Sequence, residues 1–428
     1  MNPTPSRRSL AYHESVGGFI EIQRQWERCQ GTTAPKMGLE PLRAALTALG
    51  HPEKRLRFVH IAGTNGKGST AIFLAAILQK AGYRVGLFLS PAVTLWNERI
   101  RWQGLPIPAE ECLYHWRRSC PLIREHSLGF FASWTLVSLR YFSQLSPPPD
   151  LILWETGLGG RLDPTNVVLP LLSVITTIDY DHIEILGETL EEIAREKAGI
   201  IKPHVPVVVG ALPGVAQQVL AERAREEKAP LYGPKDSPLA SRMVGYQREN
   251  SRVVVRVLQL LRDRYGWRIP DPACEYGLLH APPIPGRLER ITHRPTIWLD
   301  GAHNRSGVEA LLSALREMGV TSSITWLLAF PCHKPIDSFL GLSSAADCIM
   351  TTSLNSERPF HSADALAALF RDLIPELPVV AYDSAARAVE AWRWNATADS
   401  HLVVTGSLRL VSVVRSQWIS EQGMSFSS

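Results

Sequence analysis

A glycine-rich loop between a predicted strand and a predicted helix constrains this chain more than any other feature. Residues Phe58–Ile61 are predicted to form a short strand, the loop reads Gly63-Thr-Asn-Gly-Lys-Gly-Ser69, and residues 70–82 are predicted to form a helix. Glycines let backbone N–H groups face phosphate oxygens, and a helix N-terminus adds positive potential. Lys67 would reach the phosphates, with Ser69 near them or near their magnesium. The flanking strand and helix favour phosphate binding over a glycine-rich turn with one solvated lysine.

Apolar runs and helical patterns alternate along the chain after this loop. Strands are expected at Val85–Leu89, Leu151–Trp154 and Leu172–Thr176, and a helix is expected at Thr189–Ile201. This alternation predicts an α/β fold, in which a mainly parallel sheet carries the phosphate loop and has helices on both faces. A loosely packed helix and a loop are expected over residues 1–35.

A proline-rich stretch, Ala281-Pro-Pro-Ile-Pro-Gly286, separates this region from a second set of strands. Because 428 residues are too many for one compact core, two domains are expected. We expect residues 1–283 to form the domain with the phosphate loop and residues 284–428 to form a smaller Rossmann-like α/β domain. The strands predicted in the second domain are Thr296–Leu299, Ile324–Ala329, Cys348–Met350, Val379–Ala381 and Leu402–Val404.

The composition is that of an ordinary globular protein, with 45% hydrophobic and 20% charged residues. A net charge of +4 is small for this length, so no nucleic acid or membrane partner is expected. The chain contains no apolar run of membrane-spanning length, and we expect a cytoplasmic protein. The cysteines form no C-x-x-C pair and are expected to be free thiols: Cys29, Cys112, Cys120, Cys274, Cys332 and Cys348.

Two polar residues at predicted strand ends are candidate metal ligands. Glu155 follows an apolar strand and precedes Gly157-Leu-Gly-Gly160. A carboxylate at this end of a parallel strand, beside a phosphate loop, suits Mg²⁺, although it could equally be a simple strand-end charge. His182, which follows Asp181 after the next strand, is a second candidate, but isolated histidines are more often structural.

Each of two further polar segments is compatible with more than one role. Arg195–Lys202 is a predicted helix end with two lysines, and the residues alone favour a solvated face that suits the helix C-terminus. Asp300-Gly-Ala-His-Asn304 follows a strand of the second domain. This segment could hold ribose hydroxyls or a substrate amine, or it could be a polar turn that caps the next helix.

Seven segments resemble, in order, the folylpolyglutamate synthase/dihydrofolate synthase family of the Mur ligase superfamily. They are HIAGTNGKGST, LSPAVTLWNERI, ETGLGGRLDPTNVV, DYDHIEILGETLEEIAREKAGIIKP, IPGRLE, LDGAHN and TGSLRLV. Phosphate loops are common, whereas the third and fourth segments are highly specific to this family. The resemblance implies an ATP-dependent ligase that forms an acyl phosphate. It would add L-glutamate to dihydropteroate, to the γ-carboxyl of reduced folates, or to both.

The resemblance also implies roles for individual residues. It assigns the ATP contacts to Gly63, Thr64, Asn65, Gly66, Lys67, Gly68 and Ser69, together with Asn250, Arg287 and Asp300. It assigns Mg²⁺ to Ser90, Glu155 and His182. Lys197 matches a lysine that becomes carbamylated and helps to hold a second metal, so Lys67, Lys197 and His182 are the expected catalytic residues. The expected substrate-binding residues are Phe131, Ala132, Leu162, Asp163, Pro164 and His303.

Two positions on the folate side depart from the family pattern. The family usually has His at the position of Ala92, and it usually has Phe-Glu where this chain has Phe131-Ala132. Loss of a carboxylate from a pterin pocket costs about 1–3 kcal/mol if its partner stays buried. The departures therefore bear on the choice of pteridine.

Other functions make different demands on the sequence. A Mur-type cell-wall ligase needs an additional N-terminal domain of roughly 90 or more residues, but the phosphate loop already begins at Gly63. A P-loop NTPase or kinase without a ligase step would not need Lys197 or the segment that begins at Asp300. A catalytically inactive binding protein would not need Lys67, Glu155 and His182. The expected partners are small molecules (pteroate or folate, L-glutamate and ATP), and a monomer is expected.

Overall fold

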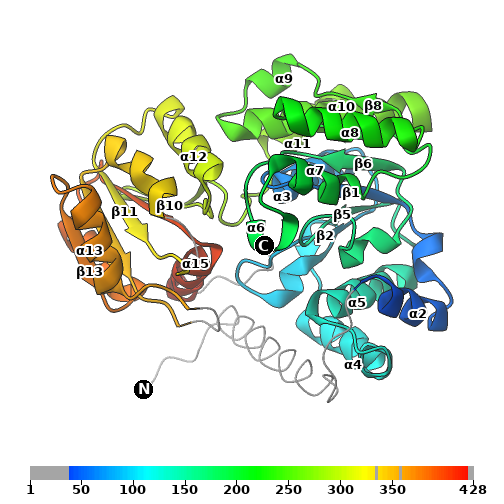
Figure 1. Ribbon diagram of the computed structural model, residues 1–428, viewed down its shortest axis with the longest axis horizontal. Coiled ribbons are helices and arrows are strands. Elements are labelled where there is room, and N and C mark those ends of the chain that lie inside the picture. Colours follow the sequence, from blue (N-terminus) through cyan, green and yellow to red (C-terminus); the bar gives the residue numbers. More distant parts are fainter. Residues whose placement is uncertain (1–37, 333–335, 356–358, 423–428) are drawn as a thin grey trace. The chain divides into compact units, whose positions relative to one another are not determined.

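The computed structural model describes residues 38–332, 336–355 and 359–422, which fold into two compact units (Figure 1). The first unit contains the described residues between 38 and 243 and then Gln247–Pro282. The second unit contains Val244–Tyr246 and the described residues between 283 and 422. The helix and loop expected over residues 1–35 lie outside the described residues.

An eight-stranded sheet lies at the centre of the first unit, in the order β4-β3-β2-β5-β1-β6-β7-β8. Neighbouring strands are parallel except at the β4 edge, where β2, β3 and β4 pair antiparallel. The predicted strands and the mainly parallel sheet are confirmed, whereas β3, β4, β7 and β8 were not predicted. The bounds are β1 (Phe58–Ala62), β2 (Val85–Phe88), β3 (Ile100–Trp102), β4 (Leu105–Pro106), β5 (Leu151–Glu155), β6 (Leu172–Ile175), β7 (Val207–Val209) and β8 (Leu231–Tyr232).

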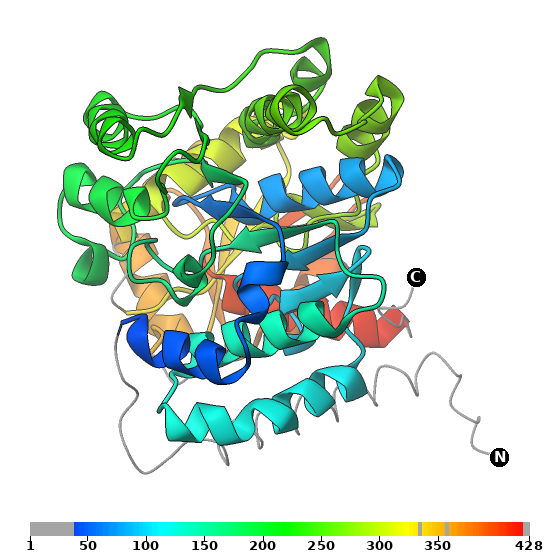
Figure 2. The same ribbon diagram turned by 90° about the vertical axis from the view of Figure 1, so that its right-hand side faces the viewer.

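Helices cover both faces of this sheet, as the two ribbon views show (Figures 1 and 2). One face carries α2 (Glu40–Ala48), α4 (Ala109–Glu125) and α5 (Phe130–Gln144), and the other carries α3 (Lys67–Lys80), α10 (Tyr246–Tyr265) and α11 (Asp271–Leu279). Helix α3 buries residues around its whole circumference, which is typical of a helix packed between other elements. The remaining helices of this unit are α6 (Ile183–Leu186), α7 (Leu190–Ala198), α8 (Gly214–Glu226) and α9 (Pro238–Ser241).

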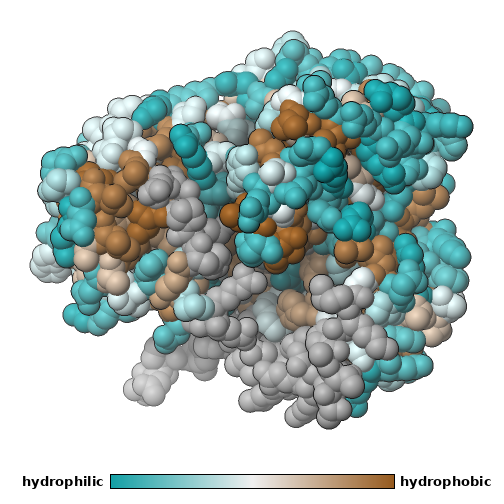
Figure 3. Space-filling model, in the orientation of Figure 1, coloured by the Kyte–Doolittle hydropathy of each residue, from teal (hydrophilic) through white to brown (hydrophobic). Residues whose placement is uncertain are grey.

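A capping box fixes the start of α7. The Thr189 hydroxyl accepts a hydrogen bond from the backbone N–H of Glu192, and the Glu192 carboxylate accepts one from the backbone N–H of Thr189. The preceding short helix α6 exposes apolar side chains, with Ile183 and Ile185 49% and 60% exposed. Figure 3 shows hydrophobic surface at this place. Together α6 and the cap define where α7 begins, and therefore where Lys197 lies in its last turn.

The second unit is built on a six-stranded sheet in the order β13-β12-β11-β14-β10-β9. All neighbours are parallel except β9, which pairs antiparallel with β10 at the edge. The five predicted strands are confirmed, and β9 was not predicted. The bounds are β9 (Glu289–His293), β10 (Thr296–Leu299), β11 (Ile324–Leu328), β12 (Cys348–Thr352), β13 (Val379–Tyr382) and β14 (His401–Thr405).

Helices α12 (Arg305–Glu317) and α13 (Ala363–Leu373) share one apolar core with this sheet and with the 3₁₀ segment Ile336–Ala345. The chain then reverses direction across the sheet, so right-handed crossovers place α14 (Ala385–Asn395) on the opposite face. Helix α15 (Leu408–Gln422) packs against α14. Across the described ranges of both units, no helix combines the length and the apolar character needed to cross a bilayer.

One expectation about the cysteines is wrong. Cys120, on α4, is disulfide-bonded. Cys112, Cys274, Cys332 and Cys348 are free thiols, as expected. The missing C-x-x-C spacing excludes only pairs that are close in sequence, and it carries no information about other pairings.

Candidate active site

The strand register brings four loops to the same end of the first sheet. Ile61 of β1 pairs with Glu155 of β5, and Ala62 pairs with Ile175 of β6. The glycine-rich loop follows β1, Ser90 follows β2, and Glu155 is the last residue of β5. In open α/β sheets, ligands bind beyond the carboxyl ends of the strands, where neighbouring connections leave in different directions. The predicted phosphate and metal residues therefore share one edge.

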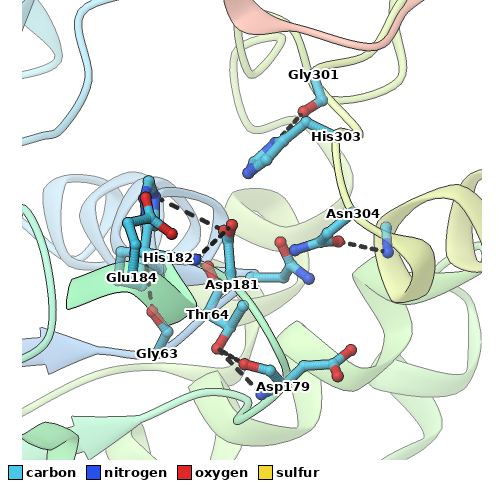
Figure 4. A network of polar contacts seen from close by, with 12 residues as sticks. Gly63, Thr64, Asp179, Asp181, His182, Glu184, Gly301, His303 and Asn304 are labelled. Atoms are coloured by element: carbon cyan, nitrogen blue, oxygen red, sulfur yellow. Dashed lines mark hydrogen bonds and ion pairs between the residues drawn. The ribbon is translucent and has the colours of Figure 1, made fainter. Parts of the chain in front are cut away.

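The glycine-rich loop is fastened to the loop that follows β6. The backbone N–H of Thr64 donates to the carbonyl of Thr177 over 2.8 Å, and the N–H of Asn65 donates to the Thr177 hydroxyl over 2.8 Å. The Thr176 hydroxyl donates to the Asn65 carbonyl over 2.6 Å. Figure 4 shows Thr64 beside Asp179, whose N–H donates to the Thr64 hydroxyl over 3.1 Å. These bonds hold the loop in shape through its backbone.

Two glycines of the loop cannot carry a side chain. Gly66 has φ +85°, and a Cβ there would lie 2.2 Å from Oδ1 of Asn250. Gly63 has φ +150°, and a Cβ there would lie 2.0 Å from the Thr176 hydroxyl. Asn250 is buried on α10, so the structure brings this predicted nucleotide residue directly against the loop. A Cβ on Gly68 would lie 3.6 Å from Oε2 of Glu155, which places the predicted metal ligand beside the start of α3.

The first turn of α3 carries polar groups that fit a phosphate. The Lys67 ammonium donates to the carbonyls of Gly63 and Thr64 over 2.9 and 3.2 Å. The hydroxyls of Ser69 and Thr70 are buried, and neither has a hydrogen-bond partner within the described ranges. Buried polar groups are normally paired, so an oxygen-rich ligand at this helix N-terminus would satisfy them.

Ser90 and Glu155, two predicted metal ligands, are in direct contact. The Ser90 N–H donates to Oε2 of the buried Glu155 over 2.9 Å. A carboxylate, a hydroxyl and substrate phosphates form the kind of oxygen-rich ligand set that suits Mg²⁺. Nη1 of Arg99 lies 3.4 Å from the Ser90 hydroxyl. Burial lowers the pKa of Arg99 to about 10, against the opposing effect of Glu155, so the side chain remains charged at neutral pH.

His182, the third predicted ligand, begins α6 in the left-handed region with φ 51°. Its backbone N–H donates to Oδ1 of Asp181 over 3.0 Å, and its ring nitrogens lie 3.8 Å from the carboxylates of Asp181 and Glu184 (Figure 4). The residues that the structure describes contain no group of three or more His, Cys, Asp and Glu side chains arranged for a metal ion.

Lys197 lies inside the protein, at the end of α7. Its side chain is 3% exposed, so the solvated face favoured by the residues alone is wrong for this lysine. Burial, and then repulsion from Lys67, lower the pKa of Lys197 to about 7, against the opposing effects of Asp181 and Asp163. A large fraction of the amine is therefore uncharged at neutral pH, which makes it a nucleophile.

The two most family-specific segments pack against each other. The N–H of Arg161 donates to the carbonyl of Glu196 over 2.7 Å, and the Asn166 amide donates to the carbonyl of Gly199 over 3.0 Å. A Cβ on Gly160 would lie 2.9 Å from the carbonyls of Glu196 and Lys197. This close approach explains why residue 160 is a glycine, and it places the loop against the helix end that carries Lys197.

The predicted folate residues divide between this loop and α5. Asp163 is buried and Pro164 begins a 3₁₀ turn, whereas Leu162 is 52% exposed. Phe131 and Ala132 lie in the first turn of α5. The Phe131 ring occupies the space beside Gly157, where a Cβ would approach it to 2.5 Å.

Arg99 was not predicted as part of the site. Its guanidinium carbon lies 5.7 Å from the ring centroid of Phe130 and 5.9 Å from that of Phe131, within cation–π range. The cation thus stands between the predicted folate residues and the Ser90–Glu155 pair. The available sequence signal was the position of Arg99 within LSPAVTLWNERI, one of the seven segments that resemble the family.

In the second unit, Asp300 is buried directly after β10. Its carboxylate accepts hydrogen bonds from the N–H groups of Ala302 and Leu288 over 2.9 and 2.8 Å, and from the Tyr246 hydroxyl over 2.8 Å. Burial raises the pKa of Asp300, whereas the positive charge of Arg287 lowers it. Tyr246 lies far from Asp300 in sequence and was not predicted.

The turn after Asp300 also caps a helix. Oδ1 of Asn304 accepts a hydrogen bond from the N–H of Gly307 at the start of α12, over 2.9 Å (Figure 4). Nδ1 of His303 lies 2.7 Å from the Gly301 carbonyl, which can only accept, so this nitrogen carries the hydrogen. The capping role is confirmed for Asn304.

Comparisons with known proteins agree with this arrangement. The family described as "Mur ligase, glutamate ligase domain" matches residues 286–408. The chain is 32% identical to dihydrofolate synthase/folylpolyglutamate synthase of Bacillus subtilis, covering 92% of this chain and 97% of that protein. It is 31% identical to folylpolyglutamate synthase of Lacticaseibacillus casei, covering 86% and 92%. The solved structure of Escherichia coli FolC with DHPP and ADP matches with a TM-score of 0.82 at 26% identity, over 96% of this chain and 98% of that one. The chain therefore belongs to the folylpolyglutamate synthase/dihydrofolate synthase family of ATP-dependent ligases.

Proposed function

We propose that this chain joins L-glutamate to the carboxylate of dihydropteroate, to the γ-carboxyl of reduced folates, or to both. The observation that carries the proposal is the proximity of two features. One is the phosphate loop, where the buried hydroxyls of Ser69 and Thr70 have no hydrogen-bond partner among the residues that the structure describes. The other is the buried Lys197, whose pKa is lowered in part by the charge of Lys67. The name of the Bacillus subtilis relative covers both reactions.

An amide does not form directly from a carboxylate and an amine at neutral pH, because the carboxylate has no good leaving group. In the proposed reaction, a substrate carboxylate oxygen attacks the γ-phosphorus of ATP and ADP leaves, giving an acyl phosphate. The uncharged α-amine of glutamate then attacks the acyl carbon, and phosphate leaves as the amide forms. Lys67 would exchange its loop carbonyls for the phosphate oxygens of ATP, where its charge stabilises the transferring group.

The donor set of Ser90, Glu155 and His182 would hold Mg²⁺, which neutralises charge on phosphoryl oxygens. Lys197 would become carbamylated: its uncharged amine forms a bond to the carbon of CO₂ and releases a proton. The carbamate would offer oxygens to a second metal ion. The pKa of about 7 supports this step, because a lysine with an ordinary pKa would be almost entirely protonated.

On the substrate side, we infer that Phe131, Ala132, Leu162, Asp163 and Pro164 contact the folate. Arg99 would neutralise the charge of the substrate carboxylate. Its guanidinium lies near both the Ser90 hydroxyl and the ring of Phe131, on the expected path of that carboxylate. Ala132 offers no hydrogen-bond acceptor where the family usually has a carboxylate, so the pteridine would be recognised with one acceptor fewer.

Further residues complete the proposal. Asn250, Arg287 and Asp300 would contact the nucleotide, and His303 would contact the substrate. In this division, residues 1–283 carry the phosphate loop and folate residues, and residues 284–428 carry Arg287, Asp300 and His303. We further propose that the protein works as a monomer in the cytoplasm, on small molecules alone.

Measurement of ADP release by the purified protein tests the proposal. Dihydropteroate, tetrahydrofolate and a UDP-muramoyl peptide are compared, each with and without L-glutamate. Glutamate-dependent release with either pterin supports the proposed function. Release that does not depend on glutamate would indicate an NTPase or kinase, and turnover on the muramoyl peptide alone would indicate a cell-wall ligase.

A further inference from the structure

A fully buried histidine lies in β1, the strand that leads into the phosphate loop. His60 has no exposed surface, and its Nε2 lies 2.9 Å from the hydroxyl oxygen of Thr165. Strand β1 is flanked by β5 and β6, so His60 belongs to a central strand of the sheet. Thr165 belongs to the loop between β5 and β6 that also carries Asp163.

The hydrogen bonds from His60 run in one direction. The Thr165 hydroxyl donates its single hydrogen to Oδ1 of Asp163 in a short contact. Its oxygen must therefore accept from Nε2 of His60, which fixes the neutral ring as the Nε2–H tautomer. Burial, and then the charge of Lys202, lower the pKa of His60 to about 3, so the ring is neutral at any working pH.

A histidine at position 60 leaves one of its ring nitrogens buried and, among the residues that the structure describes, unpaired. Nδ1 of His60 has no hydrogen-bond partner within the described ranges. An unpaired buried polar atom destabilises the folded state, and a leucine in the same strand would avoid that penalty. The donated hydrogen bond at Nε2 is what the histidine provides in return.

The series of hydrogen bonds from His60 ends at the Asp163 carboxylate, which holds the loop between β5 and β6 in shape. Oδ2 of Asp163 accepts from the N–H groups of Gly157 and Leu158 over 2.9 and 2.8 Å. Oδ1 accepts from the N–H of Thr165 over 3.0 Å as well as from its hydroxyl. Both oxygens are therefore occupied by the loop itself, and this carboxylate shapes residues 157–166 from within.

We propose that His60 and Thr165 are positioning residues, which hold the Asp163 carboxylate and thereby fix the folate-binding loop relative to the strand that carries the phosphate loop. The identity of the loop as a folate-binding element rests on the proposed function. The positioning itself rests on three contacts: His60 donates to Thr165, Thr165 donates to Asp163, and Asp163 accepts hydrogen bonds from the loop amides.

Two matched pairs of variants test the proposal. Thr165→Val keeps the shape of the side chain and removes the hydroxyl, whereas Thr165→Ser keeps the hydroxyl. His60→Leu removes the donor, whereas His60→Gln restores an amide N–H near the position of Nε2. The KM values for the pteroyl substrate and for ATP are measured separately for all four variants.

Thr165→Val should raise the KM for the pteroyl substrate by about tenfold, the effect of one lost hydrogen bond to a charged group. His60→Leu should raise this KM by a smaller factor, because His60 donates to a neutral hydroxyl. The KM for ATP should stay at the wild-type value, and Thr165→Ser and His60→Gln should recover the pteroyl KM. Equal effects on both KM values, or a His60→Gln variant as impaired as His60→Leu, would overturn the proposal.

A second readout does not depend on the substrate. Hydrogen exchange at the amides of Gly157 and Leu158 should accelerate in Thr165→Val and remain slow in Thr165→Ser, because both amides bond to Asp163. Unchanged exchange in Thr165→Val would overturn the positioning role. If the wild-type protein turned over no pterin at all, the proposed function would fail while the exchange result still decided the role of His60 and Thr165.

Discussion

The ammonium nitrogen of Lys67 lies 2.9 Å from the carbonyl oxygen of Gly63, four residues earlier in the same loop. It also bonds to the Thr64 carbonyl over 3.2 Å. The ammonium group of Lys67 thus donates to two neutral carbonyl oxygens of the loop. A phosphate oxygen accepts a stronger, charge-assisted hydrogen bond than a neutral carbonyl, so a bound nucleotide would draw the ammonium away from them.

Lys67→Met should lower ATP turnover by at least about a hundredfold, because the charge that stabilises the transferring phosphoryl group is lost. Lys80→Met is the matched control, since Lys80 ends the same helix and instead lies 4.1 Å from the centroid of the Tyr276 ring. Turnover of ATP with saturating substrates is the measurement. A Lys67→Met enzyme as active as Lys80→Met would contradict the assigned role.

Gly66→Ala should abolish nucleotide binding. The new Cβ would meet the Asn250 amide oxygen at 2.2 Å, in a backbone conformation with φ +85°. Gly82→Ala is the control, because Gly82 has a similar φ of +90° and nothing within 4 Å of the new Cβ. That variant should cost about 1 kcal/mol of stability and should still bind nucleotide. Calorimetric titration with an ATP analogue separates the two, and similar binding by both variants would argue against a crowded loop.

His60 should make the folded protein sensitive to acid. The unfolded histidine titrates near 6.5 and the folded one near 3, so only the unfolded state takes up a proton between these values. The stabilising contribution is complete above pH 6.5 and is lost as the pH falls toward 3. At pH 5 the wild-type protein should have lost on the order of 2 kcal/mol more unfolding free energy than His60→Gln. Urea unfolding of both proteins at neutral pH and at pH 5 measures this difference, and parallel losses would show that His60 titrates normally.

Ala132→Glu should change the preference between pterin substrates and leave the affinity for ATP unaltered. Ala132 lies in the first turn of α5, next to Phe131, whereas the phosphate loop begins α3. The added carboxylate could accept a hydrogen bond from a pteridine donor, and such a contact is worth about 1–3 kcal/mol. Ratios of kcat/KM for dihydropteroate and tetrahydrofolate are compared with wild type. An unaltered ratio would mean that this position does not select the pteridine.

The parts of the site that could be predicted are those whose functional groups come from residues that are close together in the sequence. The phosphate loop, with Lys67 and Ser69, is flanked by its own strand and helix, and Glu155 ends an apolar strand. Such features depend on local backbone geometry, which short sequence patterns describe well. The alternation of strands and helices, and with it the mainly parallel character of both sheets, could be predicted for the same reason.

The residues that escaped prediction depend on partners far along the chain. Thr165 meets His60 across 105 positions, and Tyr246 meets Asp300 across 54. Lys197 is buried because a loop that is distant in sequence and contains glycines packs over the end of α7. The pattern of apolar residues within α7 gives no sign of this contact. The edge strands β3 and β4 were missed because Ile100–Trp102 and Leu105–Pro106 are too short to show an alternating pattern.

Val244–Tyr246 belong to the second unit, although the residues on either side of them in the chain belong to the first. The Gly245 N–H donates to the Glu317 carboxylate over 2.8 Å, and the Tyr246 hydroxyl donates to Asp300. A fragment that begins at Pro283 would therefore lack two donors to its own acidic groups. For recombination between genes of this family, a single crossover at the proline-rich stretch would pair Asp300 from one parent with Tyr246 from the other. The two units can thus be inherited as interchangeable modules only if this tripeptide travels with the second one.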